Sequence, residues 1–513
     1  MEPQEQIAYL IGHPEELLKK KPFTRGSNTV SDRPREGENI AVGETRPAEL
    51  PAFERREISQ ARFLAELDPD CHDVLFDDNI PSITQKLNDG TYVEIEFKKM
   101  AIPFQKMIRN KHVLHLCGYP TTHTLDAQRK DPQAREDFST FKRYWKLRNQ
   151  DGMRSKMIAA QMSVGDAGLL YYFDRNGELK CRVISYQDGY VLCPHNDKNG
   201  DRLIESVYYR IGDVEYIDSY TDTYQYRHVR SYGDDSKGKP AWRLIVEEPH
   251  GFAEIPLITK RGDVPWGVVQ STIEAYEVQY NIFLVVQKRH GWGILYIKGA
   301  VSDTARKVAG AVVLQDTSLG GNGAAQYLTP PSPEGTIETL KLMEETIQKG
   351  SGTTFILPKD ISMSGDISGV AIQIAQSLDN EEALTGAIEW QNVISKMSRL
   401  FKYGIAKELV AKGKDSSAVT RFGALEITSK IKPWKPRSDS EYNQMLLTME
   451  GAGILSRKTA VELNTESAPD EEIRLSEQQA EEDEREVQKE ILINQASATK
   501  ITANDESGNS DGN

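Results

Sequence analysis

One long stretch without proline constrains this chain more than any other feature. No proline occurs from Lys359 to Lys432, and within that stretch apolar residues recur at helical spacing over about forty positions. A helix of that length would extend roughly 60 Å, because each residue adds about 1.5 Å. Gly386 and Gly404 are its expected bend points. Such a helix favours an extended assembly over one compact globule.

The length and charge of the chain narrow the classes of protein that it can belong to. With 513 residues, we expect several lobes. The net charge is -14, and the sequence contains no block of basic residues. Any contact with DNA should therefore be weak or sliding. Four cysteines are too few for a disulfide framework. No apolar run is long enough to cross a bilayer and no signal peptide pattern is present, so we expect neither secretion nor membrane insertion.

The order of patterns predicts an α+β protein. Residues 1–50 mix proline, glycine and charged residues and are expected to form a flexible arm. Helical patterns occupy roughly 136–166 and resume after 262. Between them, the segment from Gly168 to about Pro256 is rich in Tyr, Val and Ile and carries hairpin turn signals, which predicts an antiparallel β-domain bracketed by two helices.

The stretch "DISMSGDISGVAIQ" places glycines before the long helical pattern, as phosphate-binding loops do. A nucleotide-binding P-loop also needs a lysine and a hydroxyl residue after its last glycine, because these contact the terminal phosphates and magnesium. This stretch lacks that lysine, and so do "GSGTTF" and "GGNGAAQ". We therefore expect a mobile loop or turn and no nucleotide cofactor.

The sequence "HVLHLC" holds the best candidate metal ligands, His112, His115 and Cys117. We expect a strand here, in which His115 and Cys117 share a face and His112 points away. A zinc site needs further ligands that the local sequence does not supply, so packing is favoured over metal binding. "HNDKNGDRLIES" has the wrong register for a calcium loop and predicts a hairpin turn.

The segment "FKRYWKLRNQ" interleaves basic and aromatic residues. It could be a nucleic-acid surface. We favour an amphipathic helix that buries Phe141, Tyr144, Trp145 and Leu147. No nucleophile elbow and no zinc-protease motif is present, so enzyme function has no positive support.

The order of these parts resembles that of portal proteins from tailed double-stranded DNA bacteriophages, of the siphophage type. The similarity covers nearly everything from Pro51 to Glu490 and is carried by several weak local matches in the right order. These are "HLCGYPTT", "DAGLLYYFDRNGELKCRVISYQDGYVLCP", "AEIPLITKRGDVPWGVVQSTIEAYEVQYN", "MSGDISGVAIQ" and "GAGILSRKTAVELN".

The resemblance implies a ring-forming α+β fold with a helical stem and crown, an α/β wing, and a β-rich clip inserted between two stem helices. Its consecutive parts would be a flexible arm (1–50), first wing part (51–150), stem helix (151–167), clip (168–256), second stem helix (257–290), second wing part (291–347), tunnel loop (348–368), long kinked helix (369–412), wing return strand (413–439), crown helices (440–490) and disordered tail (491–513).

The resemblance also implies a function. A dodecameric ring at one capsid vertex of the virion, assembled in the host cytoplasm, would be the channel through which double-stranded DNA is packaged and ejected. Its partners would be further copies of the chain, DNA in transit, the terminase large subunit, head-completion or adaptor proteins, and the major capsid and scaffolding proteins. No membrane, metal, cofactor or catalytic residue is implied.

The implied DNA-facing residues lie in and beside the tunnel loop. They are Lys349, Ser351, Lys359, Ser362, Ser364, Gly365, Asp366 and Gly369. Two alternatives stay open: another head-to-tail connector, which would normally be shorter, and a metal-dependent enzyme that uses His112, His115 and Cys117.

Overall fold

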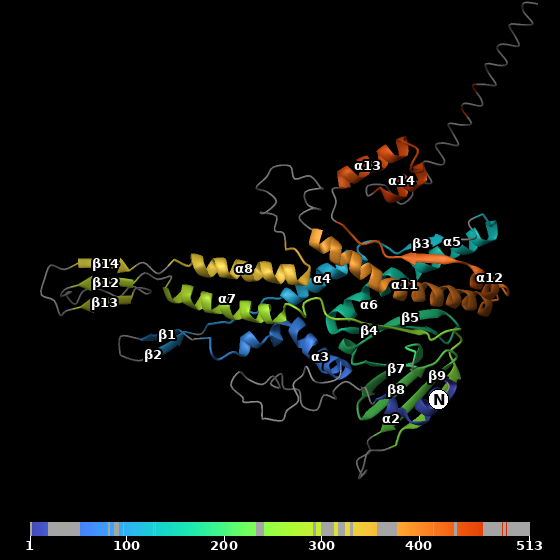
Figure 1. Ribbon diagram of the computed structural model, residues 1–513, viewed down its shortest axis with the longest axis horizontal. Helices are drawn as coiled ribbons and strands as arrows, with labels where there is room; N and C mark the ends of the chain where they lie inside the picture. Colours follow the sequence, from blue (N-terminus) through green and yellow to red (C-terminus); the bar gives the residue numbers. More distant parts are fainter. Residues whose placement is uncertain are drawn as a thin grey trace, which may run out of the picture. The chain divides into compact units, whose positions relative to one another are not determined.

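The computed structural model of the chain divides into two compact units (Figure 1). The first comprises Met1–Ile356 and Gln376–Trp434, and the second comprises Leu357–Ala375 and Lys435–Asn513. No helix in the described part of the chain is long and apolar enough to cross a membrane. The described residues are 3–18, 52–80, 83–86, 92–95, 97–126, 128, 130–197, 199–231, 241–290, 294–298, 312–316, 324–328, 332–355, 377–413, 415–435, 439–464, 485 and 489.

The long helix predicted from the sequence is confirmed over α11 (Ser377–Ala411), 35 residues without a break. It packs on α5 (Pro132–Leu147) and α12 (Ala418–Ala424), and α6 (Gln150–Val164) completes this core. The apolar stripe of α11, meaning the row of apolar side chains that faces the core, is narrower than expected, because Leu384 and Ile388 are exposed. The part of the prediction from 359 to 376 lies outside the described residues.

The helix predicted over "FKRYWKLRNQ" is present as the C-terminal half of α5. Phe141 and Trp145 are buried against Phe401 of α11 in edge-to-face contacts, as the amphipathic pattern predicted. Leu147 is exposed instead of buried, because it lies at the last turn of the helix. Asn149, in the left-handed region at φ 48°, caps α6 by accepting from the amide of Gly152.

The predicted antiparallel β-region is confirmed and forms two sheets. The three-stranded sheet has the order β11-β4-β5, and the five-stranded sheet is a meander of order β10-β9-β8-β7-β6. The predicted hairpin at Asn199-Gly200 joins β6 to β7. The strands are β4 (Asp166–Phe173), β5 (Leu179–Ser185), β6 (Val191–Asn196), β7 (Arg202–Ile211), β8 (Val214–Tyr220), β9 (Tyr224–Ser231), β10 (Arg243–Pro249) and β11 (Leu257–Arg261).

The prediction of a strand at "HVLHLC" is wrong, because α4 (Phe104–Cys117) is a helix that contains this sequence. Phe104, Ile108 and Leu116 are buried at helical spacing, and the helical pattern outweighs a short apolar run that also fits a strand. The expected return strand over 413–439 is mostly other structure. It contains α12 and the four-residue strand β15 (Ile427–Lys430), which pairs with β3 (Thr122–Leu125).

Two helices that follow the β-region lie side by side, α7 (Gln270–His290) and α8 (Glu334–Ser351). The chain between them forms three short strands, β12 (Ile294–Lys298), β13 (Val312–Asp316) and β14 (Ala324–Leu328). In this sheet β12 is central, parallel to β13 and antiparallel to β14 (Figure 1). As predicted, α6 and α7 bracket the β-region in the sequence. In the structure, α6 packs on α4 and β4, while α7 packs on α8.

A buried polar network joins α7 to the chain around α3 (Ala52–Leu67) and to the segment before α4. The His72 Nδ1 atom lies 2.7 Å from Glu277 Oε1, which also accepts from the amide of Ile102. The Trp266 indole donates to Glu66 at 3.0 Å. A short hairpin of β1 (Ile83–Lys86) and β2 (Tyr92–Ile95) belongs to the same part of the chain.

The first residues of the chain are helical, which corrects the expectation of a flexible arm over all of 1–50. They form α1 (Pro3–Gly12) and α2 (Pro14–Leu17), while residues 19–51 lie outside the described residues. Leu10 and Leu17 are buried in one cluster with Ile204, Tyr208 and Ile217 of the five-stranded sheet. The sequence signal was present: Ile7, Leu10 and Ile11 repeat at helical spacing.

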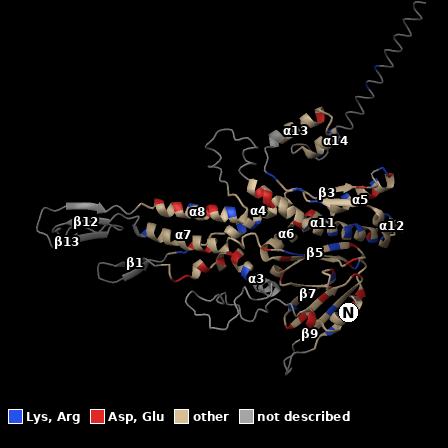
Figure 2. Ribbon diagram, in the orientation of Figure 1, with Lys and Arg blue, Asp and Glu red and all other residues tan. Residues whose placement is uncertain are grey.

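The second unit contains the two helices predicted near the C-terminus. They are α13 (Asp439–Gly451) and α14 (Arg457–Leu463), and the Ser456 hydroxyl caps α14 by accepting from the amide of Thr459. In the first unit, helices such as α8 carry both acidic and basic residues (Figure 2).

The contact of α1 and α2 with the sheet gives a first prediction. Because the Leu17 side chain is fully buried, Leu17→Ala should weaken docking of the two helices by about 3 kcal/mol. Amide hydrogen exchange should then accelerate in residues 3–17 and in β7. The control is Glu15→Ala in the same helix, where the side chain is exposed. Equal exchange in the two variants would mean that the helices do not depend on this contact.

Candidate functional site

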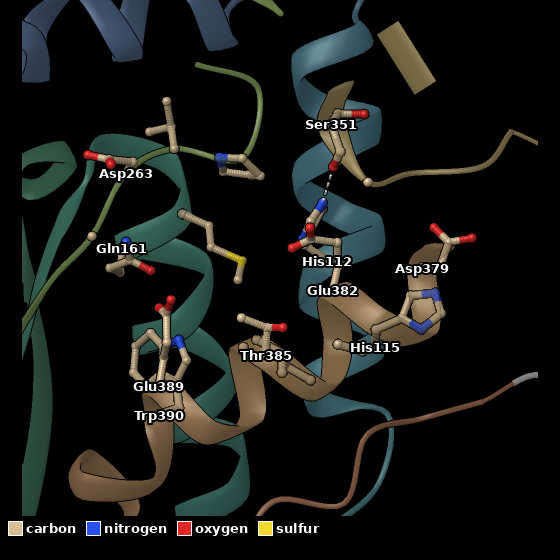
Figure 3. A pocket seen from close by; sticks show the side chains of 18 of the residues that line it. His112, His115, Gln161, Asp263, Ser351, Asp379, Glu382, Thr385, Glu389 and Trp390 are labelled. Atoms are coloured by element: carbon tan, nitrogen blue, oxygen red, sulfur yellow. Dashed lines mark hydrogen bonds between the residues drawn. The ribbon is translucent and has the colours of Figure 1, made fainter. Parts of the chain in front are cut away.

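A buried polar site lies where α8 ends, beside α4 and the first turn of α11 (Figure 3). The chain leaves α8 at Ser351 and turns at Gly352, which has φ +62°. A Cβ at Gly352 would lie 2.2 Å from the Glu382 side chain, so only glycine fits there. The turn directs residues 353–355 back across α4.

Lys111 joins the two ends of the segment that separates α8 from α11. Its ammonium donates to the carbonyl of Thr354 and lies 3.1 Å from Asp379 Oδ2. The other Asp379 oxygen accepts from the amide of Thr354 at 3.0 Å. The Asp379 side chain is only 2% exposed, so the Lys111 charge compensates a buried carboxylate. We call Lys111, His112, Thr354 and Asp379 the loop anchor.

His112 holds the same turn from the next position of α4. Its Nε2 lies 2.9 Å from the Ser351 carbonyl and 3.1 Å from the Thr353 hydroxyl. Burial lowers the pKa of His112, so the neutral ring that donates to Ser351 is favoured at neutral pH. One turn along α4, His115 Nδ1 lies 3.1 Å from the Trp434 carbonyl.

The positions of the candidate metal ligands differ from the expectation. In the helix, His112 and His115 line one pocket together, whereas the strand prediction had set them on opposite faces. Both rings are engaged with backbone carbonyls. Burial raises the pKa of the Cys117 thiol. Within the described residues, no three His, Cys, Asp or Glu side chains are grouped so that they could hold a metal ion.

The pocket beside the anchor has a volume of about 310 Å³ (Figure 3). Four carboxylates line it together with the two histidines: Asp263, Asp379, Glu382 and Glu389. A site so rich in acidic groups repels phosphate. The geometry therefore gives no support for nucleotide binding at the glycine-rich turn, in agreement with the missing lysine.

The structure describes two of the predicted DNA-facing residues. Lys349 is 76% exposed and lies 3.4 Å from Glu345, one turn earlier on α8. Ser351, expected at the surface of the loop, is buried, and its hydroxyl donates to the Gln348 carbonyl. The other predicted positions lie outside the described residues: Lys359, Ser362, Ser364, Gly365, Asp366 and Gly369.

Sequence reasoning missed the anchor. Lys111 and Asp379 are 268 positions apart, and neither belongs to a motif. Only the fold brings α4, α8 and α11 together. The one local signal was the glycine at 352, which marks a turn but not the residues that hold it.

The comparisons with known proteins identify the family. The family model "Phage portal protein, SPP1 Gp6-like" matches residues 93–486, and the chain belongs to this family. The chain is therefore a phage portal protein by family. No curated protein matches the sequence. Among solved structures, the neck of an empty GTA particle computed with C6 symmetry is similar at 13% identity over 70% of this chain and 88% of that chain. Its TM-score of 0.31 is too low to support a conclusion.

The buried ion pair of the anchor gives a second prediction. Lys111→Met leaves the Asp379 carboxylate uncompensated and should cost about 3 kcal/mol locally. The exchange rate of the Thr354 amide should rise roughly 100-fold. Adding Asp379→Asn, which removes the charge but keeps an acceptor for Thr354, should recover a large part of the loss. Lys106→Met, at an exposed lysine of the same helix, is the control. An unchanged exchange rate of the Thr354 amide in Lys111→Met would contradict the role of Lys111 in the loop anchor.

The burial of His112 gives a prediction about pH. Burial is the main effect on its pKa and lowers it below the ordinary value of about 6.5; Lys111 acts in the same direction, while the Ser351 carbonyl, Glu382 and Asp379 oppose it. The folded anchor thus binds fewer protons than the open state, so its stability rises with pH and is lost as pH falls below about 6.5.

Hydrogen exchange of the Thr353 amide between pH 7 and pH 5, corrected for intrinsic rates, measures this effect. Opening should increase toward pH 5 in the wild type and less in His112→Gln. The exposed histidine variant His13→Gln is the control and should follow the wild type. The same pH response in His112→Gln and in the wild type would assign the effect to other groups.

Proposed function

We propose that the chain forms a ring, dodecameric as in the family it resembles, at one capsid vertex, through which double-stranded DNA is packaged and ejected. The family match over residues 93–486 carries this proposal. The ring would be assembled in the host cytoplasm and become part of the virion. It would dock the terminase large subunit first and head-completion or adaptor proteins later, beside the major capsid and scaffolding proteins.

The packing of α7 on α8 supports a different placement of stem and clip from the one expected from the sequence. In this proposal α7 and α8 are the stem helices, and β12–β14 between them belong to the clip. The β-region from β4 to β11 would then be part of the wing, because the core of its three-stranded sheet is continuous with α6 and α11. The helices α13 and α14 would belong to the crown.

The segment that follows the anchor is proposed as the tunnel loop. The anchor contacts the chain on both sides of this segment, Thr354 before it and Asp379 after it. A loop that touches moving DNA needs fixed ends, since otherwise its displacement would spread into α8 and α11. Gly365 and Gly369 would allow the sharp turn toward the long helix.

The charge of the stem suits passage of DNA of any sequence. On α8, Glu334, Glu338 and Glu345 are exposed beside Lys341 and Lys349 (Figure 2). Strong phosphate binding would hold the duplex in place, whereas a mixed and mainly acidic surface does not bind the phosphates strongly and leaves the duplex free to move. Among the described residues, Lys349 is the one that we propose contacts DNA.

Electron microscopy of the purified protein tests the proposal. Rings with a central hole are expected, and a field of compact monomers at high concentration would refute the ring. Deletion of 357–366, which leaves the anchored residues Ser351–Phe355 in place, should spare the rings but impair DNA retention or translocation. Replacement of the same ten positions by glycine and serine separates loss of length from loss of side chains. If the deletion abolished rings, the segment would be a packing element.

A further inference from the structure

The exposed side of α5 carries a row of basic side chains that the proposed channel does not use. Arg135, Lys142, Arg143 and Lys146 are all exposed. At about 1.5 Å per residue, Lys142 and Lys146 stand about 6 Å apart, and Arg135 lies about 10 Å before Lys142 on the same side of the helix. We call these four residues the α5 row.

The opposite side of α5 is fixed in the core, and this decides what the row can contact. Phe141 is fully buried and Trp145 is 3% exposed, so neither ring is available to stack on a base. The rings of Phe138 and Tyr144 are half-buried, and each is in contact with a basic side chain of the row. The surface of α5 therefore presents mainly positive charge, which suits phosphate rather than bases.

The row is not neutralised by its surroundings. Among the described residues, none of its four side chains forms an ion pair, whereas the neighbouring Arg148 lies 2.9 Å from Glu408. On the other face of α5, Asp137 is already engaged by Arg421 at 2.9 Å. Glu136 is the one exposed acidic side chain of this helix. In a chain of net charge -14, this is a local excess of positive charge.

Ring contacts keep two of these side chains along the helix surface. The Lys142 ammonium lies 5.2 Å from the centre of the Phe138 ring, and the Arg143 guanidinium lies 5.5 Å from that of Tyr144. Such contacts restrict the stems while the charged ends stay in water. The row is thus partly ordered before a ligand binds.

We propose that the α5 row binds the phosphate backbone of duplex DNA, weakly and without regard to sequence. The choice of DNA rests on the proposed function. It is also favoured over an acidic protein partner because stable protein interfaces need buried aromatic or apolar anchors. Leu147, at the last turn, is the one large apolar side chain of α5 that is exposed. In a ring, repetition of the row would multiply a contact that is weak in each copy.

The test is equilibrium binding of a fluorescent mixed-sequence duplex to the full-length protein between 50 and about 200 mM salt. The row variant carries Lys142→Gln, Arg143→Gln and Lys146→Gln. The control carries Lys98→Gln, Arg175→Gln and Arg243→Gln, which removes the same charge from scattered exposed positions. Loss of three phosphate contacts should reduce the slope of log affinity against log salt by about 2.7. Affinity at 50 mM salt should fall at least about tenfold in the row variant and stay within about twofold in the control.

Two results would overturn the proposal: a row variant with wild-type affinity and slope, or equal losses in both variants. Wild-type affinity and slope in the row variant would overturn the proposal even if that variant failed to capture an acidic protein. A second duplex of unrelated sequence should bind equally well, and a marked preference would also count against phosphate contact. Because the slope is measurable in any assembly state, absence of rings would refute the portal ring without deciding this experiment.

Discussion

The packing of α11 against its neighbours is the interaction on which the first unit depends. The stripe of α11 meets α5, α6, α12 and two strands of the three-stranded sheet, elements that come from widely separated parts of the sequence. Fully burying one large apolar side chain contributes about 1.5 to 3 kcal/mol. The buried members of the stripe are Trp390, Val393, Ile394, Met397, Leu400, Phe401 and Ile405.

That same helix begins at the anchor. Asp379 lies in the first turn of α11, about two turns before Gly386, where the helix passes close to Leu116 of α4. The chain on both sides of the proposed tunnel loop is therefore held at the start of α11, the helix that contributes to the main core cluster. A force on the loop would therefore reach the core through α11 and the buried Lys111–Asp379 ion pair.

Periodicity predicted the elements well and their contacts poorly. The α11 stripe, the aromatic side of α5 and the antiparallel strands from β4 to β11 all follow from local patterns that packing reinforces. The sequence misled at α4, since a run such as "HVLHLC" fits a strand and a helix equally well. The anchor could not be predicted, because Lys111 and Asp379 meet only through the fold. The pairing of α7 with α8 was not predicted, because the glycine-rich sequence around β14 gave no strand pattern between the two helices.

The docking of α1 and α2 has a consequence for synthesis of the chain. Leu10 and Leu17 are made well before Cys193 and Ile217, which belong to the cluster that buries them. About two hundred residues must follow before that sheet can form, and domains commonly fold while synthesis proceeds. The helices α1 and α2 are therefore made with their apolar side uncovered, before the five-stranded sheet that buries it exists. The helices α1 and α2 can therefore reach their final place only after the strands that bury them have been made.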